Sequence, residues 1–150
     1  MNAGTPPIAV LSDTHDCTSH LPWEQLRGAA EIWHLGDVCD PRVIERLRGL
    51  GPPVRVVRGN CDSERSWPPI LQVERAGLRI RLQHHPPTEP MPGVDLILHG
   101  HTHVPCDVCV GGARILSPGS AGLANKGAPI SMAWLHLGGG AVRFEVIRLS

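Results

Sequence analysis

The fold prediction starts from the stretch Val94-Asp95-Leu96-Ile97-Leu98-His99-Gly100-His101-Thr102-His103. Its apolar half is short, rich in branched residues and bounded by Pro92-Gly93 and Gly100, which predicts a buried parallel strand. In an extended backbone, side chains two residues apart point the same way, so we expect His101 and His103 to converge on one point. The end of a parallel strand is where α/β proteins place their ligands.

The same arrangement recurs in the first half of the chain. Apolar runs at 7–11, 32–35 and 54–57 each lead into a polar loop, and these loops contain Asp13-Thr14-His15, Gly36-Asp37 and Gly59-Asn60. Segments 22–30 and 41–50 lie between the runs and show helical apolar spacing with proline near the start. We therefore expect a βαβαβ half with a parallel sheet.

The second half is predicted to be mostly strands. Residues 70–74 and 78–83 predict an antiparallel hairpin that ends on His84-His85. The proline-rich segment that follows, 86–93, leaves no room for a helix. Further strands are expected at 94–98, 104–110, 113–116, 130–137 and 141–149. The order of elements predicts an α/β fold with two sheets packed face to face and helices outside, in one domain spanning residues 1–150.

Charge, hydropathy and cysteine content limit the classes of function that the sequence allows. The formal net charge is +0 without runs of like charge, so nucleic acid is not an expected partner. No apolar segment approaches the ~18 residues of a membrane span, and residues 1–7 lack the features of a signal peptide, so we expect a cytoplasmic protein without membrane association. Five cysteines, an odd number, indicate reduced thiols. Cys106 and Cys109 fall on opposite faces of a predicted strand, which favours structural thiols over a metal or redox pair.

Polar side chains gather at the predicted strand ends. The set mixes imidazole nitrogen with carboxylate and amide oxygen, which suits manganese, iron, cobalt, nickel or zinc better than magnesium or calcium alone. Its members are Asp13, His15, Asp37, Asn60, His84, His101 and His103. Seven ligands are too many for one such ion and fit two if one carboxylate is shared. Two ions about 3.5–4 Å apart could hold a bridging hydroxide for in-line attack on a phosphate ester.

In their order along the chain, these motifs resemble those of the calcineurin-like metallophosphoesterase superfamily. They are Asp-x-His at 13–15, Gly-Asp at 36–37, Gly-Asn-x-Asp at 59–62, His84 and Gly-His-Thr-His at 100–103. Within the superfamily, the chain is most similar to the small bacterial and archaeal phosphodiesterases, a likeness carried by residues 57–64 and 117–120.

The resemblance implies a four-layer α/β/β/α sandwich of two mixed β-sheets flanked by helices. It also implies two divalent transition-metal ions, with manganese favoured and nickel, iron, cobalt or zinc as alternatives. The implied first ion is held by Asp13, His15 and His103. Asp37 would bridge the ions, and the second would be held by Asn60, His84 and His101, with Asn60 also near the substrate phosphate. The implied activity is phosphodiester hydrolysis, and the expected partner is a small phosphodiester or phosphomonoester.

The sequence departs from the family pattern at two positions near the site. Many members have histidine where Cys61 stands, and a neutral thiol is a weaker proton donor than an imidazolium. This predicts a preference for good leaving groups. His84 is normally followed by glycine, whereas here it is followed by His85. We hypothesise that His85 reaches the phosphate or donates to the leaving group; the alternative is a solvated loop histidine.

Two alternative functions remain. The first is a scaffold without catalysis, like the vacuolar-sorting subunit of the retromer coat, which shares this fold. A scaffold would be expected to lose ligands, whereas all seven positions carry competent donors, so the enzyme is favoured. The second is a nuclease, which the neutral charge and the lack of an aromatic platform disfavour. A homo-oligomer is compatible with the sequence.

Overall fold

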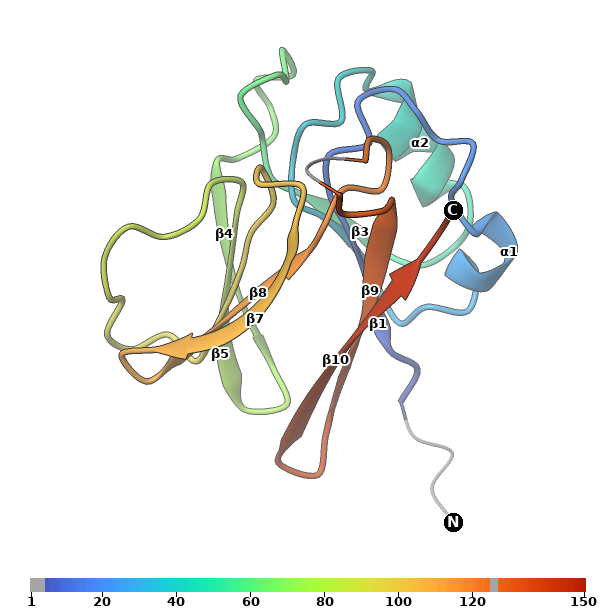
Figure 1. Ribbon diagram of the computed structural model, residues 1–150. Helices are drawn as coiled ribbons and strands as arrows, with labels where there is room; N and C mark the ends of the chain where they lie inside the picture. Colours follow the sequence, from blue (N-terminus) through green and yellow to red (C-terminus); the bar gives the residue numbers. More distant parts are fainter. Residues whose placement is uncertain (1–4, 125–126) are drawn as a thin grey trace.

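Two mixed β-sheets pack face to face in the computed structural model, which describes residues 5–124 and 127–150 (Figure 1). The first sheet has the strand order β10-β9-β1-β2-β3. Its strands are β1 (Ile8–Leu11), β2 (Ile32–His34), β3 (Val54–Val56), β9 (Ser131–Gly138) and β10 (Ala141–Arg148). The second has the order β4-β5-β6-β8-β7. Its strands are β4 (Ile70–Arg75), β5 (Leu78–Gln83), β6 (Leu96–Leu98), β7 (Pro105–Val110) and β8 (Ala113–Pro118).

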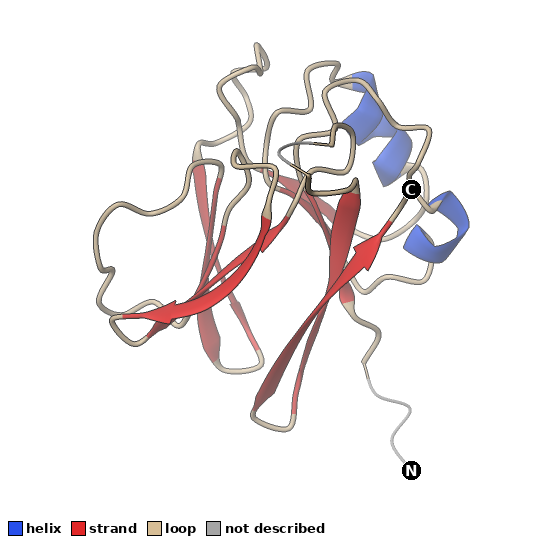
Figure 2. Ribbon diagram, viewed as in Figure 1, coloured by secondary structure: helices blue, strands red, loops and turns tan. Residues whose placement is uncertain are grey.

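The first sheet buries both of its faces. Strand β1 alternates between them: Ile8 and Val10 pack in the cluster between the sheets, while Ala9 and Leu11 pack in a second cluster under the helices. These helices are α1 (Trp23–Leu26) and α2 (Arg42–Arg48), and both lie on the outer side of this sheet (Figure 2). Strands β1, β2 and β3 are parallel, as expected from the βαβαβ pattern.

The second sheet is covered differently on its two faces. Ile80 and Leu82 of β5 point into the cluster between the sheets. On the outer face, the proline-rich segment 87–91 lies over Ile97 and Ile115 and lines a pocket with them. Ile97 is fully buried although it belongs to neither core cluster. Within the described residues, this segment therefore takes the place of a helical layer on the second sheet.

The fold predicted from the sequence is confirmed as a sandwich of two mixed sheets with helices. One expected element is wrong in length: the helix predicted at 22–30 ends at Leu26. The backbone N–H of Ala30 donates to the Pro7 carbonyl, so the chain has already turned toward β2. No helix among the described residues has the length and apolar character needed to cross a membrane.

Glu31 ties the two sheets together at the start of β2. Its carboxylate accepts hydrogen bonds from Arg75 Nε of β4 at 2.6 Å, Arg55 Nε of β3 at 3.1 Å and Trp33 Nε1 at 3.3 Å. Burial raises the pKa of Glu31, but the hydrogen bonds from Arg75, Trp33 and Arg55 outweigh it, so the pKa is lowered. The Glu31 side chain is 12% exposed, so its carboxylate is largely desolvated, whereas the side chains of Arg75 and Arg55 are 32% and 40% exposed.

We predict that Glu31→Gln lowers the free energy of unfolding by about 1–3 kcal/mol, because two guanidinium groups lose their carboxylate. Because the folded-state pKa is lowered, the stabilisation is present above the unfolded-state pKa of about 4.3 and is lost as the pH falls below it. Urea denaturation at neutral and acidic pH measures both effects. The control is Glu24→Gln, because the Glu24 side chain is 85% exposed and pairs with Arg27 at 3.5 Å. Equal effects of the two substitutions would contradict the prediction.

Candidate metal centre

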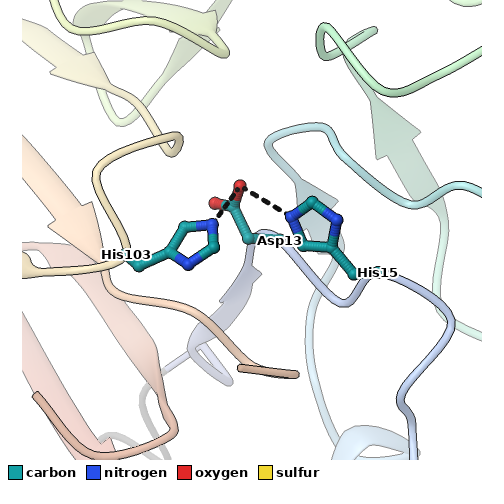
Figure 3. Close-up of side chains that lie close together, drawn as sticks. All are labelled: Asp13, His15 and His103. Atoms are coloured by element: carbon teal, nitrogen blue, oxygen red, sulfur yellow. Dashed lines mark ion pairs between the residues drawn. The ribbon is translucent and has the colours of Figure 1, made fainter. Parts of the chain in front are cut away.

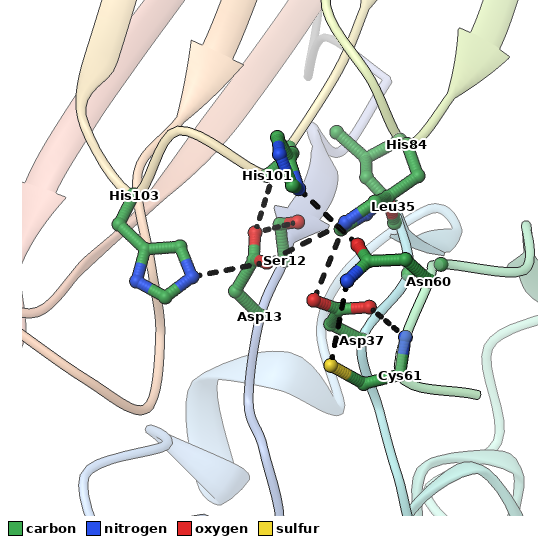
Figure 4. A network of polar contacts seen from close by, with 12 residues as sticks. Ser12, Asp13, Leu35, Asp37, Asn60, Cys61, His84, His101 and His103 are labelled. Carbon is green, nitrogen blue, oxygen red and sulfur yellow. Dashed lines mark hydrogen bonds and ion pairs between the residues drawn. The ribbon is translucent and has the colours of Figure 1, made fainter.

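Polar loops from both sheets meet at one end of the sandwich. Residues 12–15 and 36–37 follow β1 and β2, and residues 59–62 follow β3. From the second sheet, residues 84–85 follow β5 and residues 100–103 follow β6. All five strands run parallel to a neighbour in their own sheet, so their C-terminal ends face the same way. The structure brings all seven predicted ligands into this region (Figure 3 and Figure 4).

The first group of candidate ligands consists of Asp13, His15 and His103, whose ligand atoms lie within 4.8 Å of one another. His103 Nε2 lies 3.2 Å from Asp13 Oδ1, and His15 Nε2 lies 3.7 Å from the same oxygen. Figure 3 shows the two imidazoles approaching the carboxylate from opposite sides. These are the residues that the family resemblance assigns to the first ion.

The second group consists of Asp37, His84 and His101. His84 Nε2 lies 3.3 Å from Asp37 Oδ2, and His101 Nδ1 lies 3.2 Å from Asn60 Oδ1. Asp37 Oδ2 is also 3.4 Å from His15 Nε2, so this carboxylate lies between the two groups. Its placement fits the bridging role implied by the resemblance.

The side chains of His101 and His103 do not converge on one point, contrary to the expectation from their spacing. They belong to different groups, and their backbones are left-handed rather than extended. The φ angles are 71° at His101 and 61° at His103, and three other predicted ligands share this conformation, with φ angles of 55° at Asp13, 45° at His15 and 57° at Asp37. L-residues adopt it at a cost of about 1 kcal/mol or more each, and such strain clusters at functional sites.

Three buried polar atoms in the two groups lack a hydrogen-bond partner within the described part of the chain. They are Asp13 Oδ1, His15 Nε2 and His84 Nε2. Such atoms are costly unless they are satisfied by something else. Two ligand atoms that bind the same ion at about 2.1 Å, with a ligand–ion–ligand angle of about 90–110°, lie about 3.0–3.4 Å from each other. The spacings of 3.2, 3.3 and 3.4 Å fall in this range, and the 3.7 Å between His15 Nε2 and Asp13 Oδ1 is slightly longer, so the residues fit divalent cations.

The surrounding contacts prepare these side chains for ligation. Burial raises the pKa of Asp37, but contact with His84 and a hydrogen bond from the Cys61 N–H outweigh it and hold the pKa well below its usual range. The carboxylate is therefore ionised. His84 Nδ1 donates to the Leu35 carbonyl at 2.7 Å, which leaves Nε2 directed at Asp37. A histidine ligand held through its other ring nitrogen is typical of metal sites.

Asp62 is a positioning residue whose role was not predicted. Its carboxylate accepts backbone N–H groups from Asp37, Val38, Cys39 and Gly59 at 2.7–2.9 Å. It thereby fixes the turn that carries Asp37 against the loop that carries Asn60. The signal in the sequence was the last position of the Gly-Asn-x-Asp motif at 59–62.

His34 supports the same turn from beneath. Its Nδ1 accepts the Gly36 N–H at 3.1 Å, and its Nε2 lies 3.1 Å from Thr14 Oγ1. Complete burial lowers the pKa of His34 to about 4, so it is neutral at physiological pH. It is a buried histidine that also orders a loop of the site.

The two departures from the family pattern lie at the edge of the site. Cys61 is exposed, and its thiol lies within 4.8 Å of ligand atoms of His15 and Asp37. Burial of part of the side chain and the nearby Asp37 charge raise the pKa of Cys61, so the thiol is neutral. His85 is exposed as well, and its ring lies 4.4 Å from that of His101 between centroids. Both residues therefore lie beside candidate ligands, Cys61 next to His15 and Asp37 and His85 next to His101.

Cys106 and Cys109 lie on β7, away from this region. Cys106 is half-buried and Cys109 is exposed, and neither belongs to a candidate metal group among the described residues.

Comparisons with known proteins point to one family. A model of the calcineurin-like phosphoesterase superfamily domain matches residues 7–140. A probable metallophosphoesterase from Methanothermobacter thermautotrophicus is 30% identical over 159 residues, covering 94% of this chain and 91% of that protein. Phosphodiesterase YfcE of Escherichia coli is 32% identical over 108 residues, or 63% of this chain and 58% of YfcE.

Solved structures show the same architecture. The structure of YfcE, described as a phosphoesterase, has a TM-score of 0.70 at 25% identity and covers 96% of this chain and 100% of its own. Vps29 of Entamoeba histolytica, solved as a single mutant, has a TM-score of 0.75 at 21% identity, covering 96% and 99%, and shows the fold alone. Wild-type Vps29 of that organism has also been solved as a zinc complex. On the match over residues 7–140 and the relative aligned along nearly its whole length, the chain belongs to the calcineurin-like phosphoesterase superfamily.

Proposed function

We propose that the chain is a metal-dependent phosphodiesterase with two divalent ions in its site. The observation that carries this proposal is the pair of ligand groups on either side of Asp37, with three buried ligand atoms that have no hydrogen-bond partner among the described residues. The nitrogen-rich donor set favours manganese, with nickel, iron, cobalt or zinc as alternatives. The similarity to YfcE, named a phosphodiesterase, supports diesters as the substrate class.

The protein's own residues would act by positioning. Asp13, His15 and His103 would hold one ion, and His84, His101 and Asn60 the other, with Asp37 shared. Bound divalent ions supply positive charge for the phosphoryl oxygens and lower the pKa of water toward neutrality. Asp62 and the Leu35 carbonyl keep the ligands oriented, because they hold the backbone of Asp37 and the ring of His84. Asn60 is exposed, and its Nδ2, which contacts Cys61 Sγ at 3.6 Å, would donate to a phosphoryl oxygen of the substrate.

A non-catalytic scaffold is the second candidate function, favoured by the structural likeness to Vps29. Metal binding does not separate the two functions, because Vps29 itself has been solved with zinc. Turnover does separate them. The ligand set is complete here, so the enzyme remains our proposal.

We predict that the chelated protein hydrolyses bis(p-nitrophenyl) phosphate after Mn²⁺ is restored, and faster than p-nitrophenyl phosphate. Asp37→Asn should lower kcat/KM for the diester by about 1000-fold or more, because both ligand groups lose their shared oxygen. It should also weaken Mn²⁺ binding measured by calorimetry. Asp95→Asn is the control, since Asp95 pairs with Arg79 at the opposite end of β6. A wild-type protein that binds Mn²⁺, Ni²⁺ or Zn²⁺ without any turnover would favour the scaffold.

The thiol at Cys61 leads to a prediction of how the hydrolysis rate depends on the leaving group. A neutral thiol gives little help to departure of an alkoxide, so Cys61→His should raise kcat for alkyl phosphodiesters by about tenfold or more. The same substitution should change hydrolysis of p-nitrophenyl diesters much less, because that leaving group departs without protonation. Rates for a series of esters with leaving groups of graded pKa measure the difference. A uniform change across the series would contradict a role at this position in leaving-group protonation.

His85 is proposed to contact the phosphoryl group from the exposed side of His101. His85→Ala should lower kcat/KM for phosphodiesters by about 10–100-fold while the bound Mn²⁺ stays constant, since the ring is outside both ligand groups. Steady-state kinetics with metal analysis measure both quantities. His20→Ala is the control, because His20 is exposed on the loop before α1. Unchanged diester turnover in His85→Ala would identify His85 as a solvated loop residue.

A further inference from the structure

A second pocket opens beside the second ligand group, at the end of β5. It has a volume of about 340 Å³ and is continuous with the site through Asn60 and His84, which line both. Arg58, Arg81 and His85 line the remainder of its polar surface, together with Gln83. The pocket is therefore larger than one phosphate group, and none of its described lining residues is an Asp or Glu.

The two arginines of this pocket have no carboxylate partner in the described part of the chain. Arg58 NH1 donates to the Arg65 carbonyl at 3.4 Å, and Arg81 Nε donates to Gln83 Oε1 at 2.7 Å. By contrast, Arg79 pairs with Asp95 and Arg75 pairs with Glu31. Two half-buried guanidinium groups without counter-charge, beside a phosphoesterase site, form a positively charged surface suited to an anion.

Arg81 is held in place by its neighbours. Gln83 accepts the Arg81 hydrogen bond through its side-chain oxygen and donates its Nε2 to the His85 carbonyl at 2.7 Å. The guanidinium is thereby tied to the loop that follows β5. A guanidinium group whose position is fixed before binding loses little conformational freedom when it pairs with a phosphate.

We propose that this pocket binds a second phosphate group of the substrate. The preferred substrates are then phosphodiesters with an additional phosphate on the sugar or alcohol portion, as in a nucleotide diester whose sugar carries a second phosphate. This inference rests on the proposed function. The scissile phosphate is bound at the ligand groups, and the second phosphate pairs with Arg58 and Arg81. Planar guanidinium groups can pair with phosphate through two parallel hydrogen bonds.

The test uses two matched substrates: a p-nitrophenyl nucleotide ester and the same ester with a second phosphate on its sugar. In the Mn²⁺-loaded wild-type protein, the second phosphate should lower KM about tenfold. Arg81→Gln and Arg58→Gln should each remove most of this advantage, raising KM for the doubly phosphorylated ester about tenfold and that for the simple ester much less. Arg79→Gln is the matched control, since Arg79 lies two residues earlier on β5 and is paired with Asp95.

Failure of the inference and failure of the proposed function give different results. Equal KM ratios in the wild type and both arginine variants, with both esters turned over, would overturn the second-phosphate pocket alone. Absence of turnover with either ester would count against the phosphodiesterase. In that case, calorimetric titration of the chelated protein with a nucleoside bisphosphate and with the matching monophosphate still tests whether the pocket binds a second phosphate. Tighter binding of the bisphosphate, lost in Arg81→Gln, supports it, and equal binding overturns it.

Discussion

The geometry of the site depends on the hydrogen bonds that the Asp62 carboxylate accepts. It accepts four backbone N–H groups from two loops, three of them from the consecutive residues 37–39. Those N–H groups point toward one spot because the turn has a left-handed residue at Asp37 and another at Cys39. A concave arrangement of this kind favours an anion. Asp62 supplies that anion from within the chain, and Asp37 is thereby free to direct its own carboxylate toward the imidazoles.

Close approach of the loops also requires glycine at two positions. A Cβ on Gly59 would collide with the backbone and carboxylate of Asp37, and one on Gly100 would collide with Ser12 and Asp13. The first contact joins neighbouring strands of one sheet, whereas the second joins the two sheets. The His101 N–H then donates to Asp13 Oδ2 at 3.0 Å. The ligand groups thus form because the loops touch through backbone atoms, with side chains left for the cation.

The sequence predicted much of this arrangement because apolar runs that end in polar loops are a local and regular signal. The strands, the two-sheet sandwich and the set of residues brought to one end of it were all accessible in this way. The conformation within the loops was not. An i, i+2 spacing was interpreted as extended backbone, whereas His101 and His103 adopt left-handed φ angles and join different groups. The Gly-Asn-x-Asp motif at 59–62 marked the position of Asp62 but not its partners, because these come from contacts between the loops after β2 and β3. Arg58 and Arg81 are far apart in sequence and share a pocket only after folding.

The position of β1 within its sheet has a consequence for the order of folding. This strand, which carries Asp13 and His15 at its end, is flanked by β2 on one side and by β9 on the other. Since β9 begins at Ser131, a ribosome must release nearly the whole chain before the sheet can close around β1. Pairings between segments so far apart in sequence are slow to form. The candidate ligands, all within residues 13–103, therefore leave the ribosome before β9, and the strand that carries Asp13 and His15 stays at an open sheet edge until β9 pairs with it.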